Sequence, residues 1–198
     1  MKLKSSLVTL CTFLSLSASA YSQFSEWNTT IGGGANITTF DSANTESGVG
    51  YFFGLTQRFF FSDHVGLFSG AELIQRKLSF QSSTLSGASS SGSANYIDVP
   101  AGLSFQYGAW GSGLGHADVG VSYGIPLGDY SINGATFDAR SFLSLLLSFS
   151  TAFPVSEDFY LGFKLAYKYA LADSVDDTTG GGSKSRDFNF GIISHFTY

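Results

Sequence analysis

The sequence predicts an all-β fold: an eight-stranded antiparallel up-and-down transmembrane β-barrel. Three observations lead to this prediction. Apolar and polar residues alternate with a period of two in eight segments, which is the spacing of a strand with two different faces. Charged residues fall almost entirely on the face opposite to the apolar one. The connectors between segments are long on one side and mostly shorter on the other, as in a meander of antiparallel strands.

The chain begins with the features of a secretory signal peptide. Lysines precede a mostly apolar stretch from Leu7 to Leu16, and Ala18-Ser19-Ala20 has the small-x-small form of a cleavage site. The apolar stretch is shorter than the roughly 20 residues that a spanning helix needs. We therefore expect residues 1–20 to be a signal peptide that is removed after export through the Sec pathway, and residues 21–198 to form the barrel domain.

The composition excludes several other classes of protein. The chain has 10 basic and 15 acidic residues and no basic cluster, whereas nucleic-acid binding depends on grouped Lys and Arg. The one cysteine, Cys11, lies in the expected signal peptide, so the mature barrel has neither a disulfide nor a thiolate metal site. Abundant glycine and aromatic residues with few prolines favour strands joined by glycine-containing turns.

The first three expected strands, residues 27–40, 49–60 and 65–80, alternate less regularly than those that follow. In the fourth, residues 96–107, Ile97, Val99 and Leu103 share a face opposite Asp98 and Ser104. The fifth, residues 116–125, alternates without a break. Its apolar face contains Ala117, Val119, Val121, Tyr123 and Ile125, and its other face contains His116, Asp118, Gly120, Ser122 and Gly124.

The last three expected strands are residues 142–153, 159–171 and 188–198. In the first of them leucines alternate with serines, except that Leu146 falls on the polar face. Each of the eight segments supplies the 9 to 11 residues that a tilted transmembrane strand needs. An even number of strands places both ends of the barrel domain at the side of the short connectors, residues 61–64 and 154–158. We expect that side to face the periplasm and the long connectors to be extracellular.

The distribution of charge favours a membrane barrel over a soluble one. The apolar faces contain only Lys77, at the end of its strand, because a Lys or Arg facing lipid at mid-depth costs roughly 2 to 4 kcal/mol. The opposite faces should line the lumen, where charges need partners. We therefore predict salt bridges in a lumen charge network of seven residues: Arg58, Glu72, Arg76, Asp98, Asp118, Lys164 and Lys168.

Two further expectations concern the wall of the barrel. Pro100 lacks a backbone donor and a closed barrel has no edge strand, so we expect a bulge at this residue. Aromatic residues near the short connectors should form an interfacial girdle. The girdle residues are Phe59, Phe60, Phe61, Trp110, Phe153, Phe159, Phe196 and Tyr198.

Three stretches carry a resemblance to a known family. They are Val49-Gly50-Tyr51-Phe52-Phe53-Gly54 leading into Phe61-Ser62-Asp63, Val65-Gly66-Leu67-Phe68-Ser69-Gly70-Ala71-Glu72-Leu73, and Tyr96-Ile97-Asp98-Val99-Pro100. With these residues the chain resembles the porin family or outer membrane protein β-barrel domain, which is related in architecture to the eight-stranded OmpA barrel. The resemblance implies that Phe190, Ile192, Phe196 and Tyr198 form the terminal signal for outer-membrane assembly, although Ser194 departs from the usual pattern.

The residues that could carry chemistry have simpler explanations. His64, His116 and His195 show no spacing typical of a metal site, and Ser194 and His195 have opposite parity, so the serine cannot be activated by its neighbour. The glycine groups lack the strand-loop-helix context of a phosphate loop. We expect no catalytic residue, no metal site and no cofactor.

The sequence therefore predicts a non-enzymatic protein of the Gram-negative outer membrane, with a structural or surface-interaction role and at most a narrow pore. The expected partners are outer-membrane lipid and lipopolysaccharide, periplasmic chaperones and the barrel-assembly machinery. We expect a monomer and no nucleic acid. Two alternatives stay open: a lipid A-modifying outer-membrane enzyme, and a secreted soluble β-barrel carrier, in which the face of residues 117–125 would point inward.

Overall fold

The computed structural model describes residues 26–41, 45–80, 90–109, 113–132, 135–176 and 182–197. The expected signal peptide, Trp110 and Tyr198 lie outside these ranges. No helix formed by the described residues is long and apolar enough to cross a membrane.

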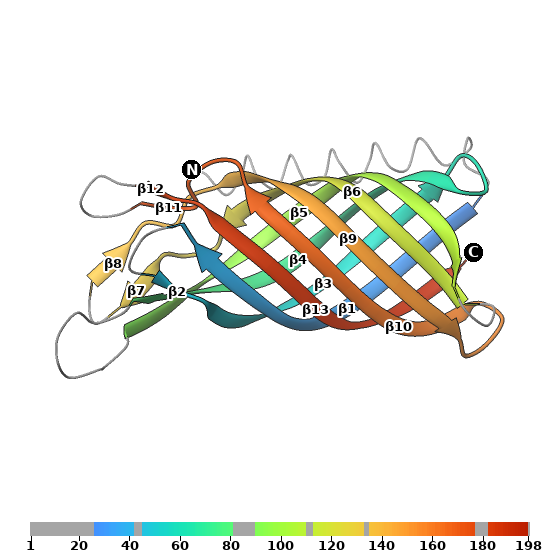
Figure 1. Ribbon diagram of the computed structural model, residues 1–198, viewed down its shortest axis with the longest axis horizontal. Coiled ribbons are helices and arrows are strands. Elements are labelled where there is room, and N and C mark those ends of the chain that lie inside the picture. The colour runs from blue at the N-terminus through green and yellow to red at the C-terminus, as the bar shows by residue number, and fades with distance from the viewer. Residues whose placement is uncertain are drawn as a thin grey trace.

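Eight long strands form a closed antiparallel barrel (Figure 1), which confirms the predicted fold class. Each strand pairs with the next, and the last pairs with the first. The predicted bounds agree within three residues, except that β5 begins six residues earlier than predicted. The strands are β1 (Glu26–Phe40), β3 (Gly48–Phe60), β4 (Val65–Phe80), β5 (Ser90–Ala109), β6 (Gly113–Pro126), β9 (Phe142–Pro154), β10 (Phe159–Ala170) and β13 (Ser185–Thr197).

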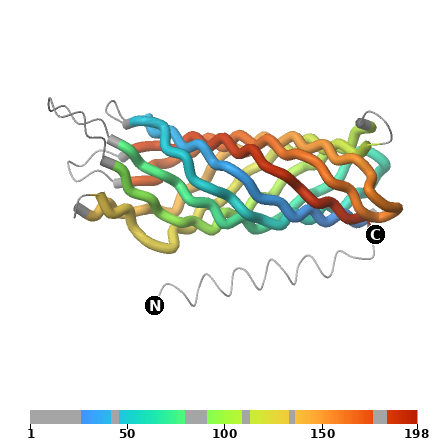
Figure 2. Tube along the Cα trace, turned by 90° about the horizontal axis from the view of Figure 1, so that it is seen from below, coloured from blue at the N-terminus to red at the C-terminus, as the bar shows by residue number. Residues whose placement is uncertain are grey.

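Strands β1 and β13 close the barrel through a ladder that runs from Asn28 opposite Thr197 to Phe40 opposite Ser185. Both ends of the described chain therefore lie at the same end of the barrel, beside the two short connectors (Figure 2). We call this the short-connector end and the opposite one the long-connector end.

The described residues also form five short strands at the long-connector end, where the sequence predicts only connectors (Figure 1). β2 (Thr45–Glu46) extends the pairing of β4. β7 (Tyr130–Ile132) and β8 (Ala135–Phe137) form a hairpin, and β11 (Val175–Asp176) pairs with β12 (Gly182–Ser183). Strands of two or three residues show too little alternation to be recognised from the sequence.

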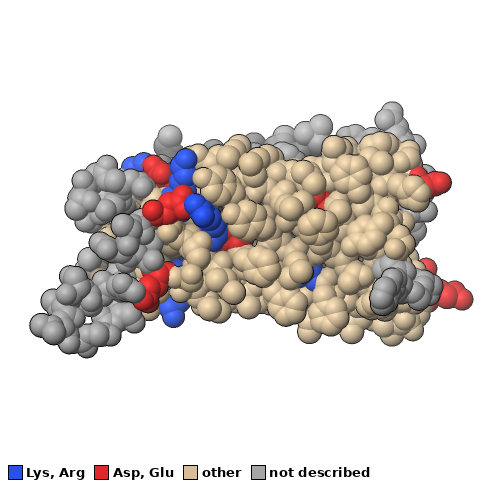
Figure 3. All heavy atoms as spheres, in the orientation of Figure 1, with Lys and Arg blue, Asp and Glu red and all other residues tan. Residues whose placement is uncertain are grey.

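The two faces of the wall differ in polarity, as the alternation predicted. In β9, buried Ser144, Ser148 and Ser150 alternate with exposed Leu145 and Leu147. Figure 3 shows one side of the barrel, with charged side chains mainly near the two ends and a mostly uncharged surface between them. Val119 is 50% exposed and Tyr123 is 47% exposed, so the apolar face of β6 points outward. This is the opposite of what a soluble carrier requires.

The bulge expected at Pro100 is absent. Ser69 pairs with Ala101 and Glu72 pairs with Asp98, so the register between β4 and β5 is the same on both sides of the proline. The pairing is interrupted for the two residues between them, while Pro100 keeps its place opposite Ser122 in the ladder to β6. The wall therefore accommodates the missing donor through a local gap in one ladder, without an inserted residue.

The expected aromatic girdle is partly wrong. Phe60 is fully buried and its ring lies 5.9 Å from that of His116, so it closes the interior near the short-connector end. Phe60 has the parity of the inward-facing Arg58, and the sequence analysis had grouped it with its neighbours without regard to parity. Phe61 and Phe153 are exposed, and Phe159 contacts Phe196 with ring centroids 5.2 Å apart.

Candidate functional site

The barrel interior contains the charged residues that the sequence analysis had assigned to the lumen. All seven side chains point inward and are buried, and β13 contributes an eighth, Asp187. The buried charged set is then four cations, Arg58, Arg76, Lys164 and Lys168, and four carboxylates, Glu72, Asp98, Asp118 and Asp187. The interior is thus formally neutral when its two buried histidines are uncharged.

Asp187 is the member that the sequence analysis missed. The expected strand begins at Phe188, whereas β13 begins at Ser185 and so includes Asp187. Asp187 has the same parity as Asn189, Gly191 and His195 in the sequence, and extending the alternation by one residue would have included it. Its carboxylate accepts a hydrogen bond from the Thr38 hydroxyl at 2.8 Å, which ties β13 to β1 inside the barrel.

Six of the eight charges form one continuous network, the large network. Arg76 binds Asp187 at 2.6 Å and makes two hydrogen bonds to Asp98, at 2.9 and 3.1 Å. Lys168 bridges Asp98 and Glu72 at 2.7 Å each. Lys164 ends the network on the other oxygen of Glu72, at 2.5 Å. These charges come from β4, β5, β10 and β13, so the network ties opposite parts of the wall together.

The Arg76 guanidinium group is also enclosed by aromatic rings. Its central carbon lies 4.6 Å from the centre of the Tyr96 ring and 4.9 Å from that of Phe142. A guanidinium group can bind carboxylates at its edge and rings at its faces, which the ammonium group of lysine cannot do in the same way. Arg76 therefore connects the charged interior to an apolar cluster at the long-connector end.

The other two charges form the small network, nearer the short-connector end. Arg58 binds Asp118 in a bidentate manner, at 2.7 and 3.1 Å. It also donates to the Thr30 hydroxyl at 2.7 Å, and Asp118 accepts from Ser104 at 2.7 Å. Each ion therefore has neutral hydrogen-bonding partners besides its counter-ion, which offsets the cost of removing it from water.

Two histidines lie beside the small network. The rings of His116 and His195 are 4.9 Å apart, and Nδ1 of His195 is hydrogen-bonded to the Thr30 hydroxyl at 2.9 Å. The described residues contain no group of three or more His, Cys, Asp or Glu side chains that could hold a metal ion. His64 is exposed in a short connector, whereas His116 and His195 are buried.

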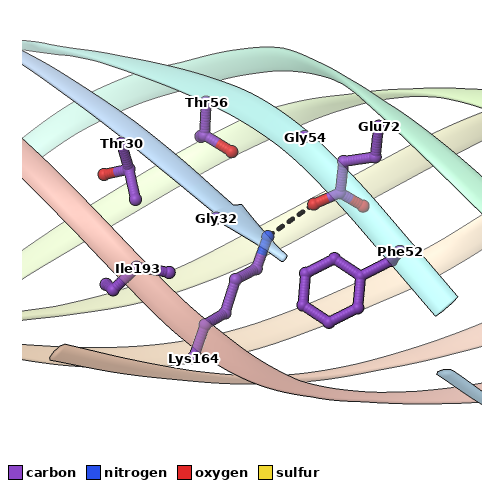
Figure 4. Close-up of a pocket in the computed structure, with 8 residues that line it drawn as sticks. All are labelled: Thr30, Gly32, Phe52, Gly54, Thr56, Glu72, Lys164 and Ile193. Carbon is purple, nitrogen blue, oxygen red and sulfur yellow. Dashed lines mark hydrogen bonds and ion pairs between the residues drawn. The ribbon is translucent and has the colours of Figure 1, made fainter. Parts of the chain in front are cut away.

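A small cavity adjoins both networks (Figure 4). Its volume is about 10 Å³ when measured as the space open to the centre of a water molecule. This is enough for about one water molecule. Lys164 reaches across it toward Glu72, and the ring of Phe52 lies beside that ion pair (Figure 4). The remaining lining residues are Thr30, Gly32, Gly54, Thr56 and Ile193.

The interior also contains an apolar patch that interrupts its polar lining. Leu146, the residue that departs from the alternation of β9, is buried against Phe68 and Ala166. Its parity in the sequence already places Leu146 on the polar face, and the structure confirms that its side chain points inward. Phe68, Leu146 and Ala166 pack against one another inside the wall, so polar parity in the sequence marks the inner face without making every residue on it polar.

Three of the four residues expected to form the assembly signal, Phe190, Ile192 and Phe196, lie on the outer face of β13. Phe190 and Ile192 are exposed and Phe196 is partly exposed. Tyr198 lies outside the described residues. Ser194 also faces outward and His195 faces inward, as their parity predicted.

Comparison with solved structures shows which proteins share this architecture. Outer membrane protein OprG from Pseudomonas aeruginosa superposes with a TM-score of 0.57 over 89% of this chain and 97% of its own, at 13% identity. Neisserial surface protein A superposes with a TM-score of 0.54 over 85% of this chain and 95% of its own, at 11% identity. The chain has the fold of an eight-stranded outer-membrane β-barrel. The fold implied by the family resemblance is thus confirmed.

Comparisons of the amino-acid sequence identify no related family or protein. No model of a known protein family matches it, and no curated protein sequence matches it. At 13% identity or less, the two structures establish a shared fold alone.

The described interior contains a pair of side chains of a kind that can carry chemistry. The Thr30 hydroxyl and the His195 imidazole form a pair of the kind that can activate a nucleophile, and the sequence analysis did not foresee it. However, Thr30 is buried and its oxygen also accepts a hydrogen bond from Arg58. The carboxylates of Glu72, Asp98 and Asp118 are likewise held by cations. The arrangement suits a closed, neutral interior.

Proposed function

We propose that this protein is an outer-membrane barrel whose interior is closed to solutes, and that it serves envelope structure or surface interaction through its long connectors. One observation carries the proposal: the polarity of the wall is inverted. Large apolar side chains cover the outside, and the described interior contains eight mutually paired charges. A surface of this kind is stable against lipid and not against water.

Two further observations support the membrane location. The fold matches proteins that are named an outer membrane protein and a surface protein. A closed barrel also leaves no unpaired sheet edge in hydrocarbon. From the signal peptide and the even strand count we infer export through the Sec pathway, periplasmic ends of the barrel domain and extracellular long connectors. The proposed partners are outer-membrane lipid, lipopolysaccharide, periplasmic chaperones and the barrel-assembly machinery, with the protein itself a monomer.

The decisive experiment for the membrane barrel is gel electrophoresis of membrane fractions in detergent, with and without heating. A folded barrel keeps its shape in the unheated sample and migrates differently from the unfolded chain. We expect two distinct mobilities and recovery in the outer-membrane fraction. Identical mobilities, or recovery in the soluble periplasmic fraction, would contradict the proposal.

The closed interior is tested separately by recording current across planar bilayers that contain the purified protein. Paired charges and the buried Phe52 and Leu146 occupy the described interior, and the cavity beside Lys164 and Glu72 has room for about one water molecule. We expect no conductance steps of porin size. Steps of that size would show that the interior opens, and the role of the ion network would then have to be revised.

The non-enzymatic part of the proposal has its own test. Some outer-membrane barrels modify lipid A, and an enzyme of that kind is one of the two alternatives that the sequence leaves open. Mass spectrometry of lipid A from cells that overproduce this protein should show the same acylation pattern as cells without it. A changed pattern, abolished by Thr30→Val, would make the buried Thr30–His195 pair catalytic.

A further inference from the structure

The hairpin of β7 and β8 lies across the long-connector end of the barrel. The two inward-facing residues of β7, Tyr130 and Ile132, are buried, whereas Ser131 between them is exposed. Their side chains join an apolar cluster contributed by the ends of several wall strands and by β11. The other buried members are Phe40, Leu78, Ala94, Tyr96, Phe142, Ala170 and Val175.

The hairpin is held in a different way from the wall. Among the described residues, the backbone of β7 pairs with that of β8. Ala139, which follows β8, forms an isolated backbone bridge with Val175 of β11. The ion pairs described above lie below the hairpin. Its contacts with the wall are apolar, such as the Tyr130 ring 6.3 Å from that of Phe40 and 6.4 Å from that of Tyr96. At its base, Asp129 accepts a hydrogen bond from the backbone of Ala139, and Leu127 donates to the backbone of Asn95.

With these contacts, detaching the hairpin should require less free energy than detaching a strand of the wall. A wall strand cannot leave without breaking two ladders of hydrogen bonds. The hairpin can leave by withdrawing the side chains of Tyr130, Ile132 and Phe137 from the cluster and keeping its own pairing. Segments with few buried contacts open at a lower free energy than the global unfolding of a protein. We propose that the β7–β8 hairpin is a lid that opens as a unit over the long-connector end while the wall stays intact.

An opened lid would uncover the layer directly beneath it, where Tyr96 and Phe142 enclose Arg76. The lid therefore controls whether solvent reaches the large network from this end. The proposal depends on the proposed function only in naming this end extracellular. Its tests use purified protein in detergent, so they do not depend on where the barrel resides in the cell.

Gly92 of β5 provides a way to displace the lid. A side chain added at Gly92 would collide with the side chain of Ile132 and the backbone oxygen of Ser131, so this close approach requires glycine. Gly108 lies on the same strand, and a side chain added there would meet nothing within 4 Å. Gly92→Val should therefore displace β7 from β5 and open the lid. Gly108→Val is the matched control, because the same side chain meets no neighbour there.

The experiment measures how fast a single cysteine reacts with a thiol reagent, in a Cys11→Ser background that removes the one native cysteine. Ile132→Cys reports on the buried face of the lid, and Ser131→Cys on its exposed face. We expect Ile132→Cys to react at least tenfold more slowly than Ser131→Cys, and to do so while the unheated protein keeps the mobility of the folded barrel. Gly92→Val should bring the two rates together, and Gly108→Val should leave them apart.

Three results would overturn the lid. Equal rates in the parent would show that the hairpin is not closed. Reaction of Ile132→Cys only when the folded mobility is lost would show that the hairpin opens with the barrel and not before it. Unchanged rates in folded Gly92→Val would show that β7 does not depend on the close approach. If Gly92→Val does not fold, Tyr130→Ala replaces it, because it removes the larger of the two inward side chains.

Discussion

Arg76 is the residue on which the large network depends most. It contacts two carboxylates and two aromatic rings, and it is fully buried. A buried ion pair contributes little net stability compared with an apolar replacement, but removing one partner leaves the other charge buried without compensation. Replacing Arg76 alone should therefore lower the stability of the folded barrel substantially.

We predict that Arg76→Met lowers the free energy of unfolding by about 3 to 5 kcal/mol, because Asp187 then keeps no cationic partner among the described residues. Urea unfolding, followed by the loss of the folded band on unheated gels, measures the effect. Combining Arg76→Met with Asp187→Asn should recover part of the loss, and a strictly additive double variant would argue against a coupled pair.

Arg186 is the matched control for Arg76. It also binds an aspartate, Asp41, at 2.7 Å, but its side chain is 48% exposed. Exposed ion pairs contribute about 0 to 1 kcal/mol. Arg186→Met should therefore stay within that range, and a loss as large as that of Arg76→Met would show that burial is not the cause.

Gly34 determines how closely β1 and β13 approach where the barrel closes. A side chain added at Gly34 would collide with the backbone of Phe190 and Gly191, and backbone cannot move aside as a flexible side chain can. We predict that Gly34→Ala lowers the free energy of unfolding by about 1 to 3 kcal/mol, because the strands must repack around the new side chain. On gels, a smaller fraction of the unheated protein should migrate as the folded barrel. Gly108→Ala, with open space around it, should leave that fraction unchanged.

At the scale of the element, β9 shows what alternation predicts and what it does not. Its serines and leucines take opposite faces, as expected, but Leu146 fills a gap between Phe68 and Ala166 inside the barrel. No pattern within one strand indicates that gap, because its walls come from β4 and β10. The same holds for Pro100. Its missing donor is accommodated by a two-residue interruption in the ladder to β4, which no pattern within β5 indicates.

We predict that Leu146→Ala destabilises the barrel by about 2 to 5 kcal/mol, as large-to-small changes in a packed interior do. Adding Ala166→Leu should restore part of the loss, since the new side chain enters the same space. Urea titration of both variants tests this. If the double variant is no more stable than Leu146→Ala, the interior at this level is not packed as described.

At the scale of the whole molecule, the inverted polarity of the wall has a direct test. Leu147 lies midway along β9 and is 41% exposed. Leu147→Arg should cost about 2 to 4 kcal/mol in lipid vesicles, the usual cost of a cation facing the middle of a bilayer. Val155→Arg, at an exposed connector residue, is the control and should cost little. Equal small effects would mean that lipid does not cover β9.

Alternation and charge predicted the eight wall strands, their two faces and seven of the eight charges in the described interior, because both are local properties that recur along each strand. The tertiary structure alone decided which charges pair, since Arg76, Asp98, Asp187 and Lys168 lie on four different strands. It also placed Tyr130 and Ile132 over the end of the barrel and Phe60 inside it. Those contacts arise only when the sheet closes and brings distant segments to a common interior.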